Sequence, residues 1–80
     1  MQFEPVHALI TRANAADSSH EQFKDVPGML PFAPEVGTPL QLFLDNGKVM
    51  RTSPVRHVAH LGSDWVVDTA NSQYRLKVTA

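Results

Sequence analysis

The dipeptide Asn46-Gly47 lies between two alternating apolar segments and constrains the fold more than any other feature of the sequence. Asn-Gly favours the two-residue type I′ turn of a β-hairpin, because both central residues of that turn need a positive φ angle. Such a turn predicts the cross-strand pairs Asp45–Lys48, Leu44–Val49, Phe43–Met50 and Leu42–Arg51. Both faces of this hairpin carry apolar residues, so we expect it to be covered on more than one side.

Short strand-like segments continue from this hairpin to residue 79. Residues 74–79, YRLKVT, alternate apolar and polar side chains, and residues 65–69, WVVDT, are rich in β-branched and aromatic types. Gly, Ser, Asn and Asp gather at 62–64 and 70–73, where they predict turns. Strands at this short spacing predict an antiparallel meander of about five strands that closes into a small barrel over residues 37–80.

The stretch TSPVRHVAHLG has two interpretations. Ser53 as N-cap and Pro54 in the first turn predict a short helix, which would place His57 and His60 on one face. A strand would point the two histidines to opposite faces. Arg56 opposes the helix dipole in the first turn and two valines weaken a helix, so we favour the strand and keep the helix as the alternative.

The first part of the chain is less regular. Residues 5–13 read as a strand with Val6, Ala8 and Ile10 on one face. Residues 17–28 carry a helix signature, because Ser18 and Glu21 match a capping box. Two apolar residues three apart, Phe23 and Val26, would dock that helix.

A proline-rich arm is expected over residues 27–39, because its four prolines disfavour regular structure. Met29, Leu30 and Phe32 make this arm too apolar for a free linker, so we expect it to be ordered and to cap the barrel. The N-terminal part, residues 1–36, would then pack on a β-barrel core of residues 37–80 within a single domain of 80 residues.

The composition excludes several classes of protein. The chain has no cysteine, which rules out disulfides, thiolate metal sites and a cysteine nucleophile. The absence of cysteine from so small a domain favours a reducing compartment, and the start of the sequence does not resemble a signal peptide. No apolar segment approaches the length of about 20 residues that a membrane helix needs. We therefore expect a cytoplasmic protein without a membrane partner.

Charge is unevenly distributed along the chain. The formal net charge is -1, which argues against a dedicated polyanion binder. Residues 1–44 carry two basic and five acidic side chains, whereas residues 45–80 carry five basic and three acidic ones. The second part therefore offers a candidate nucleic-acid face with two aromatic rings for base stacking. Its members are Lys48, Arg51, Arg56, Arg75, Lys77, Trp65 and Tyr74.

Catalytic and metal-binding motifs are lacking. The serines do not lie in a G-x-S-x-G context, and no phosphate-binding glycine pattern or H-E-x-x-H motif occurs. A metal site on His57 and His60, completed by His7, His20 or an acidic residue, would require the helical interpretation of their segment. The sequence therefore predicts a non-enzymatic protein without a cofactor or metal.

The segments GTPLQLFLDNGKVMRTSPV and GSDWVVDTANSQYRLKV, within residues 37–78, resemble short, mostly uncharacterised bacterial proteins with an SH3-like β-barrel. The hairpin is also similar to the L-x-L-x-N-G-K hairpin of Sm-type barrels, and that resemblance implies RNA binding. Neither resemblance assigns a role to any single residue.

Together these observations predict a mainly β domain, an SH3-like barrel with a short N-terminal helix and a proline-rich arm. We expect a cytoplasmic, non-enzymatic binding module for an unidentified protein partner, present as a monomer or a weak homodimer. The alternative is weak RNA binding through the basic strand face.

Overall fold

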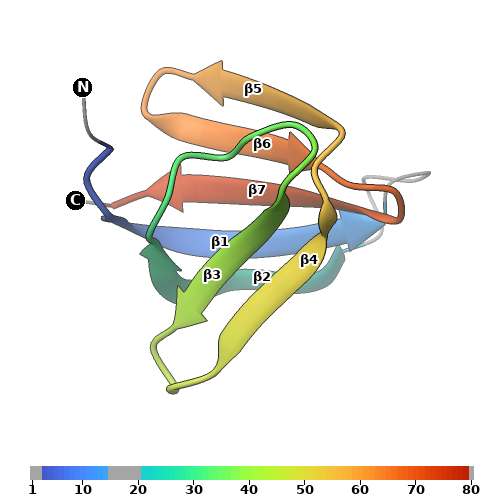
Figure 1. The fold of residues 1–80 in the computed structure, drawn as a ribbon. Helices are drawn as coiled ribbons and strands as arrows, with labels where there is room; N and C mark the ends of the chain where they lie inside the picture. The colour runs from blue at the N-terminus through green and yellow to red at the C-terminus, as the bar shows by residue number, and fades with distance from the viewer. Residues whose placement is uncertain (1–2, 15–20, 80) are drawn as a thin grey trace.

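The computed structural model describes residues 3–14 and 21–79 and places them in one curled sheet (Figure 1). The strands are β1 (Val6–Asn14), β2 (Glu21–Leu30), β3 (Pro39–Leu44), β4 (Val49–Pro54), β5 (His57–Leu61), β6 (Asp64–Asp68) and β7 (Ser72–Val78). Neighbouring strands are antiparallel and follow the order β4-β3-β2-β1-β7-β6-β5. The described residues contain no helix. The prediction of a small, mainly β domain is confirmed. Five strands, β3 to β7, lie in residues 37–80 as expected, and β2 is the strand that was not predicted.

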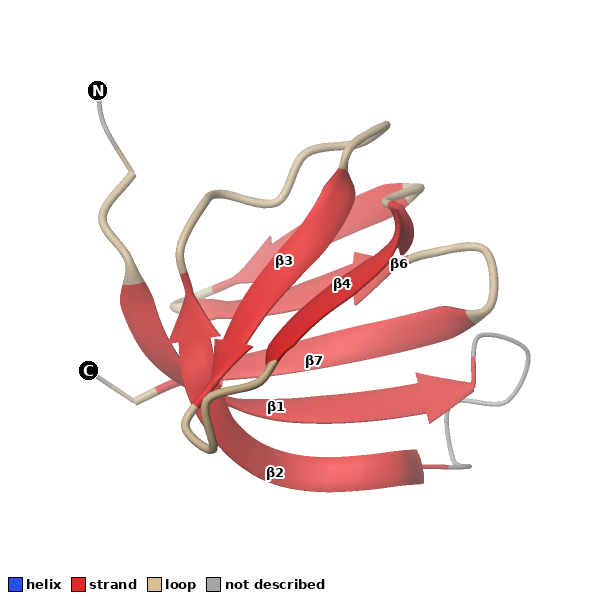
Figure 2. Cartoon of the chain, turned by 60° about the horizontal axis from the view of Figure 1, so that its bottom comes forward, coloured by secondary structure: helices blue, strands red, loops and turns tan. Residues whose placement is uncertain are grey.

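The sheet curls into a half-barrel. Its curvature brings the hairpin β3–β4 across the front of β1 and β7 (Figures 1 and 2). Its inner face forms one core, made of Ala8, Ile10, Leu30, Leu40, Leu42, Val55, Val67, Tyr74 and Leu76. The two edge strands, β4 and β5, follow one another directly in the chain. Between them, Val55 is buried and exchanges hydrogen bonds with the arm, since Gly37 N–H donates to its carbonyl over 2.8 Å and its own N–H donates to Thr38 over 3.0 Å.

Strand β1 lies at the centre of the sheet, between β2 and β7. The predicted strand over residues 5–13 is confirmed, and Ala8 and Ile10 point into the core as expected. Because β1 and β2 supply the middle of the sheet, these two strands are an integral part of the half-barrel and do not form an appendage packed on β3 to β7.

The prediction of a helix over residues 17–28 is wrong for residues 21–28, which belong to β2; residues 17–20, including Ser18, lie outside the described residues. Arg12 pairs with Phe23 and Ile10 with Val26, so two residues of β2 lie opposite one residue of β1. This is a β-bulge, and Asp25 takes a φ of 52° in it. A bulge puts residues three apart on the same face, so the Phe23–Val26 spacing imitated a helix.

The proline-rich arm begins later than predicted, because Pro27 lies in β2 opposite Leu9. Strand β3 pairs with β2 only at Gly28 and Met29, so no neighbouring strand needs the N–H that Pro27 lacks. The Pro27 carbonyl accepts the N–H of Asp45 over 3.1 Å. The remainder of the arm, residues 31–38, is ordered.

The Asn46-Gly47 hairpin is confirmed, but its predicted register is shifted by one residue. Phe43 pairs with Val49 and Leu42 pairs with Met50. Leu44 N–H donates to Lys48 over 2.8 Å, and only Gly47 has a positive φ in the turn, at 90°. The connection is therefore a three-residue loop with glycine in the left-handed region, a standard alternative to the type I′ turn. As a result Met50 joins Leu42 on the inner face and Val49 is exposed.

The strand interpretation of the segment before Gly62 is confirmed, since residues 57–61 form β5 in continuous register with β6. Gly62 has a φ of 64° at the first central position of the β5–β6 turn, whereas Ser63 does not have a positive φ. This combination is typical of a type II′ hairpin turn. Because β5 is extended, His57 and His60 point to opposite faces of the sheet.

Candidate functional site

The five predicted cations do not form one stripe. Arg75 and Lys77 lie on the outer face of β7, whereas Lys48 and Arg51 lie on the hairpin β3–β4. Strands β7 and β4 are separated by three other strands, which is about 19 Å along the sheet at roughly 4.8 Å per strand. Arg56 is exposed in the link between β4 and β5. The basic residues are therefore scattered around the half-barrel.

Arg75 has a structural partner on the outer face. Its Nη2 donates to Glu21 Oε2 over 2.9 Å, and the pair spans β1, which lies between their strands. Below this bridge lie Thr11, opposite Arg75, and Ala13, opposite Glu21, and both are buried. The ion pair thus links β2 to β7 across the outer face of β1 and covers these two buried residues.

We expect Glu21→Gln to change the free energy of unfolding by no more than about 0.5 kcal/mol, because exposed ion pairs are screened by water. The Glu21 side chain is 31% exposed and the Arg75 side chain is 41% exposed. Urea denaturation should show a smaller difference from wild type at about 1 M salt than at low salt. Asp45→Asn, in an exposed turn, is the matched control. A loss of several kcal/mol for Glu21→Gln would show that the bridge is a major structural element.

The two predicted stacking rings differ in their surroundings. Tyr74 is only 3% exposed and belongs to the core, with the Arg12 guanidinium 5.7 Å from its ring centre. Trp65 is half-buried, and the His60 ring stacks on it at 3.8 Å with an angle of 7°. Phe3 meets Trp65 edge-on at 6.4 Å. Tyr74 is therefore removed from any surface, and one face of Trp65 is already covered.

A shallow cavity of about 170 Å³ lies on the outer face beside Arg75 and Lys77. Leu61 and Val66 provide apolar surface there, and Arg75 and Lys77 provide charge. The carboxylate of Asp64 also lines it, and accepts the backbone N–H of Val78 over 3.1 Å. The carboxylates of Asp64 and Glu21 thus accompany the two cations of this face, which gives it no strong preference for a polyanion.

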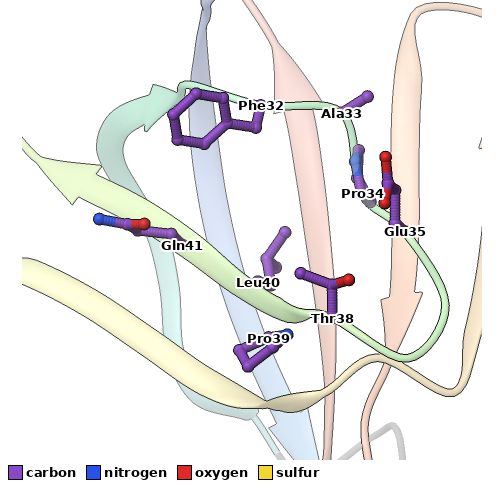
Figure 3. A pocket seen from close by; sticks show the side chains of 8 residues that line it. All are labelled: Phe32, Ala33, Pro34, Glu35, Thr38, Pro39, Leu40 and Gln41. Carbon is purple, nitrogen blue, oxygen red and sulfur yellow. The ribbon is translucent and has the colours of Figure 1, made fainter.

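A larger cavity, about 260 Å³, lies between the proline-rich arm and the start of β3 (Figure 3). The arm supplies one wall and the beginning of β3 supplies the other, with the Leu40 side chain pointing into the space between them. The lining residues are Phe32, Ala33, Pro34, Glu35, Thr38, Pro39, Leu40 and Gln41. We call this cavity the arm pocket.

The arm pocket combines apolar walls with one charge. Phe32 is 65% exposed and does not cap the core as predicted. Pro31 is buried and Pro34 half-buried, and two such rigid residues hold the arm so that the ring between them stays outside. Glu35 is the only charged residue among those that line the pocket, and no ion pair to it is found within residues 3–14 and 21–79. The pocket therefore suits a cationic group on an apolar stem.

Residue types alone did not point to this pocket, because Phe32 and Glu35 match no catalytic or binding motif. The one available signal was an apolar residue flanked by Pro31 and Pro34, in a segment that cannot pack as a regular element. The pairing of the arm with Val55, which holds the pocket wall in place, depends on contacts between distant parts of the chain.

The described histidines, His7, His57 and His60, are not brought together at a metal site, and the fourth candidate, His20, lies outside the described residues. His57 Nδ1 lies 3.6 Å from Asp68 Oδ2 on the outer face, whereas His60 packs on Trp65 on the other face. Among the residues that the structure describes, no group of three or more histidine, aspartate or glutamate side chains is placed to hold a metal ion. The same residues include no helix of the length and hydropathy needed to cross a membrane.

Comparison of this chain with family models, with curated proteins and with solved structures finds no match.

Proposed function

We propose that this protein is a non-enzymatic interaction module that binds a segment of a partner protein in the arm pocket. The bound segment presents a lysine or arginine side chain to Glu35 and lays its aliphatic stem on Phe32. The observation that carries the proposal is the coincidence of an exposed aromatic ring and a carboxylate without an ion-pair partner in the described residues, both lining one concave site.

The chemistry of the pocket supports a peptide ligand. An exposed apolar ring loses water-contacting surface when a partner covers it, which contributes about 25 cal/mol per Å². The aliphatic stem of the lysine or arginine covers the ring while its charged head reaches Glu35, where an ion pair near solvent contributes up to about 1 kcal/mol. Thr38 at the end of the arm and Gln41 in β3 offer hydrogen-bonding groups to a ligand. The cavity of about 260 Å³ accommodates one or two side chains and is small for a whole cofactor.

Selection from a random peptide display library tests this proposal, with the variant Phe32→Ala as the counter-selection target. We expect the wild-type protein to enrich peptides that contain lysine or arginine, and both Phe32→Ala and Glu35→Gln to lose most of the binding of a selected peptide. Loss of the apolar contact on the ring, or of the ion pair, at about 1 kcal/mol corresponds to a drop in affinity of roughly fivefold.

Val49→Ala is the control variant, because Val49 is similarly exposed, at 59%, but lies in β4 outside the pocket. It should bind the selected peptides as the wild type does. Peptides that bind Phe32→Ala and wild type equally well, or a selection that enriches acidic residues, would contradict the proposed site.

RNA binding is the second candidate function, carried by the exposed Lys77 and the outer face of β7. The burial of Tyr74 and the pairing of Arg75 with Glu21 weaken it. A salt titration with single-stranded RNA decides the matter, because phosphate contacts weaken steeply as salt increases. Absence of binding at low salt excludes this candidate, as does equal binding by Lys77→Glu.

A further inference from the structure

Within residues 3–14 and 21–79, strands β2, β4 and β5 each have a stretch of edge without a neighbouring strand, and the edges of β2 and β4 are protected against strand addition. Strand β2 is unpaired on one side over residues 21–26, where it carries a bulge at Asp25 and the charge of Lys24. The edge of β4 ends in Pro54, which has no N–H, and its neighbour Val55 is occupied by the arm. Bulges, charges and prolines are the usual protection of edges against strand addition.

The third edge, that of β5, has none of these devices. The sequence of β5 is His-Val-Ala-His-Leu, without proline, lysine, arginine or an acidic residue. Its register with β6 runs from His57 to Leu61 without a bulge. Strand β5 is last in the sheet order (Figure 1). At the end of this strand Leu61 is 64% exposed.

The β5–β6 turn determines which backbone groups point outward. In a two-residue hairpin the residues next to the turn, here Leu61 and Asp64, form a hydrogen-bonded pair, and such pairs alternate along the ladder. Leu61, Ala59 and His57 therefore direct their N–H and C=O groups toward β6. The N–H and C=O groups of Val58 and His60 point away from the sheet. These outward groups are symmetric about Ala59.

We propose that a second copy of this chain pairs its own β5 antiparallel with this edge, about a twofold axis at Ala59. Val58 then faces His60 of the second copy, and each such pair exchanges two hydrogen bonds. The twofold axis generates the same pair again, so four hydrogen bonds join the copies, as an antiparallel ladder requires. The two half-barrels would form one continuous sheet with an isologous interface.

The side chains of β5 suit this self-pairing. Ala59 faces Ala59 of the second copy in a non-hydrogen-bonded pair, where Cα atoms come as close as about 4.5 Å and small residues are favoured. The exposed Leu61 faces His57 of the second copy, and no histidine faces another histidine. The interface thus covers apolar surface without placing two like charges opposite each other. It does not involve the arm pocket, so it is independent of the proposed function.

Sedimentation-velocity measurements over a range of protein concentrations test the proposal, with the variants Ala59→Lys and Ala59→Glu. Each variant places two like charges directly opposite one another, so we expect each to dimerise at least about fivefold more weakly than wild type. An equimolar mixture of the two should regain dimers, because lysine then faces glutamate. That recovery also shows that both variants are folded. Val49→Lys, on the other edge strand, is the control and should dimerise like the wild type.

Hydrogen exchange of the wild-type protein supplies a second measurement without any substitution. The amides of Val58 and His60 should become protected as the protein concentration rises, whereas the exposed amide of Lys48 should not change. A wild-type protein that remains monomeric to roughly millimolar concentration overturns the proposal. A dimer that tolerates Ala59→Lys and Ala59→Glu, or one that Val49→Lys disrupts, also overturns it.

Discussion

The substitution Ile10→Ala is expected to lower the free energy of unfolding by about 3–4 kcal/mol, the range typical of a fully buried large residue replaced by alanine. Ile10 is 0% exposed on the central strand and pairs with Val26 on one side and Leu76 on the other. A cavity at this position is lined by several strands, so it cannot be filled by the movement of one of them. Urea denaturation followed by tryptophan fluorescence measures the effect.

The loss expected for Ile10→Ala is a large part of the total free energy of unfolding of this domain. A domain of 80 residues is stabilised by roughly 4–12 kcal/mol in total, so Ile10→Ala should leave a substantial unfolded population or a strongly lowered Tm. Val49→Ala removes apolar atoms from a side chain that is 59% exposed and should stay within about 0.5 kcal/mol of wild type. Equal effects of the two variants would contradict the assignment of Ile10 to the centre of the core.

The second large effect is expected for Gly28→Ala, which should be destabilising by about 2–3 kcal/mol because it overfills a packed site. A β-carbon at Gly28 would lie 2.8 Å from the Phe43 carbonyl oxygen and 2.8 Å from Ile10 Cδ1. The first of these atoms belongs to the backbone of β3, which pairs with β2 here. Relief of the clash would therefore separate the two strands where the hairpin joins the sheet.

Gly62→Ala separates steric from conformational effects. Gly62 has no atom within 4 Å of an added β-carbon, but its φ of 64° disfavours any residue with a side chain. We expect this variant to lose only about 1–2 kcal/mol, the strain of a left-handed residue. Chemical denaturation of both variants gives the comparison. A smaller loss for Gly28→Ala than for Gly62→Ala would mean that β3 can move away from β2 without consequence.

Alternation of side chains and turn residues predicted much of the fold. The hairpin around Gly47, the strands β5, β6 and β7, and the inward face of β1 all follow from short-range patterns. These elements have tight turns, so the partner of each strand is its neighbour in sequence. The exception is the pairing of β1 with β7, which joins residues about 60 positions apart and leaves no local trace.

The errors have local physical causes as well. A bulge at Asp25 gave β2 the apolar spacing of a helix, and one extra loop residue before Gly47 exchanged the faces of β4. Both the bulge and the extra loop residue shift a strand by one residue, which moves every following side chain to the opposite face of the sheet. The arm pocket was missed because its walls come from an irregular segment, whose course depends on hydrogen bonds to Val55.

The central position of β1 also has a consequence for synthesis on the ribosome. A nascent chain that ends before residue 72 lacks β7, so β1 would pair with β2 on one side only. Its other side would present the open backbone of seven residues, Ala8 to Asn14, to any extended chain nearby. Completion of the half-barrel must therefore wait for the last strand to emerge, and stalled translation would produce an aggregation-prone intermediate.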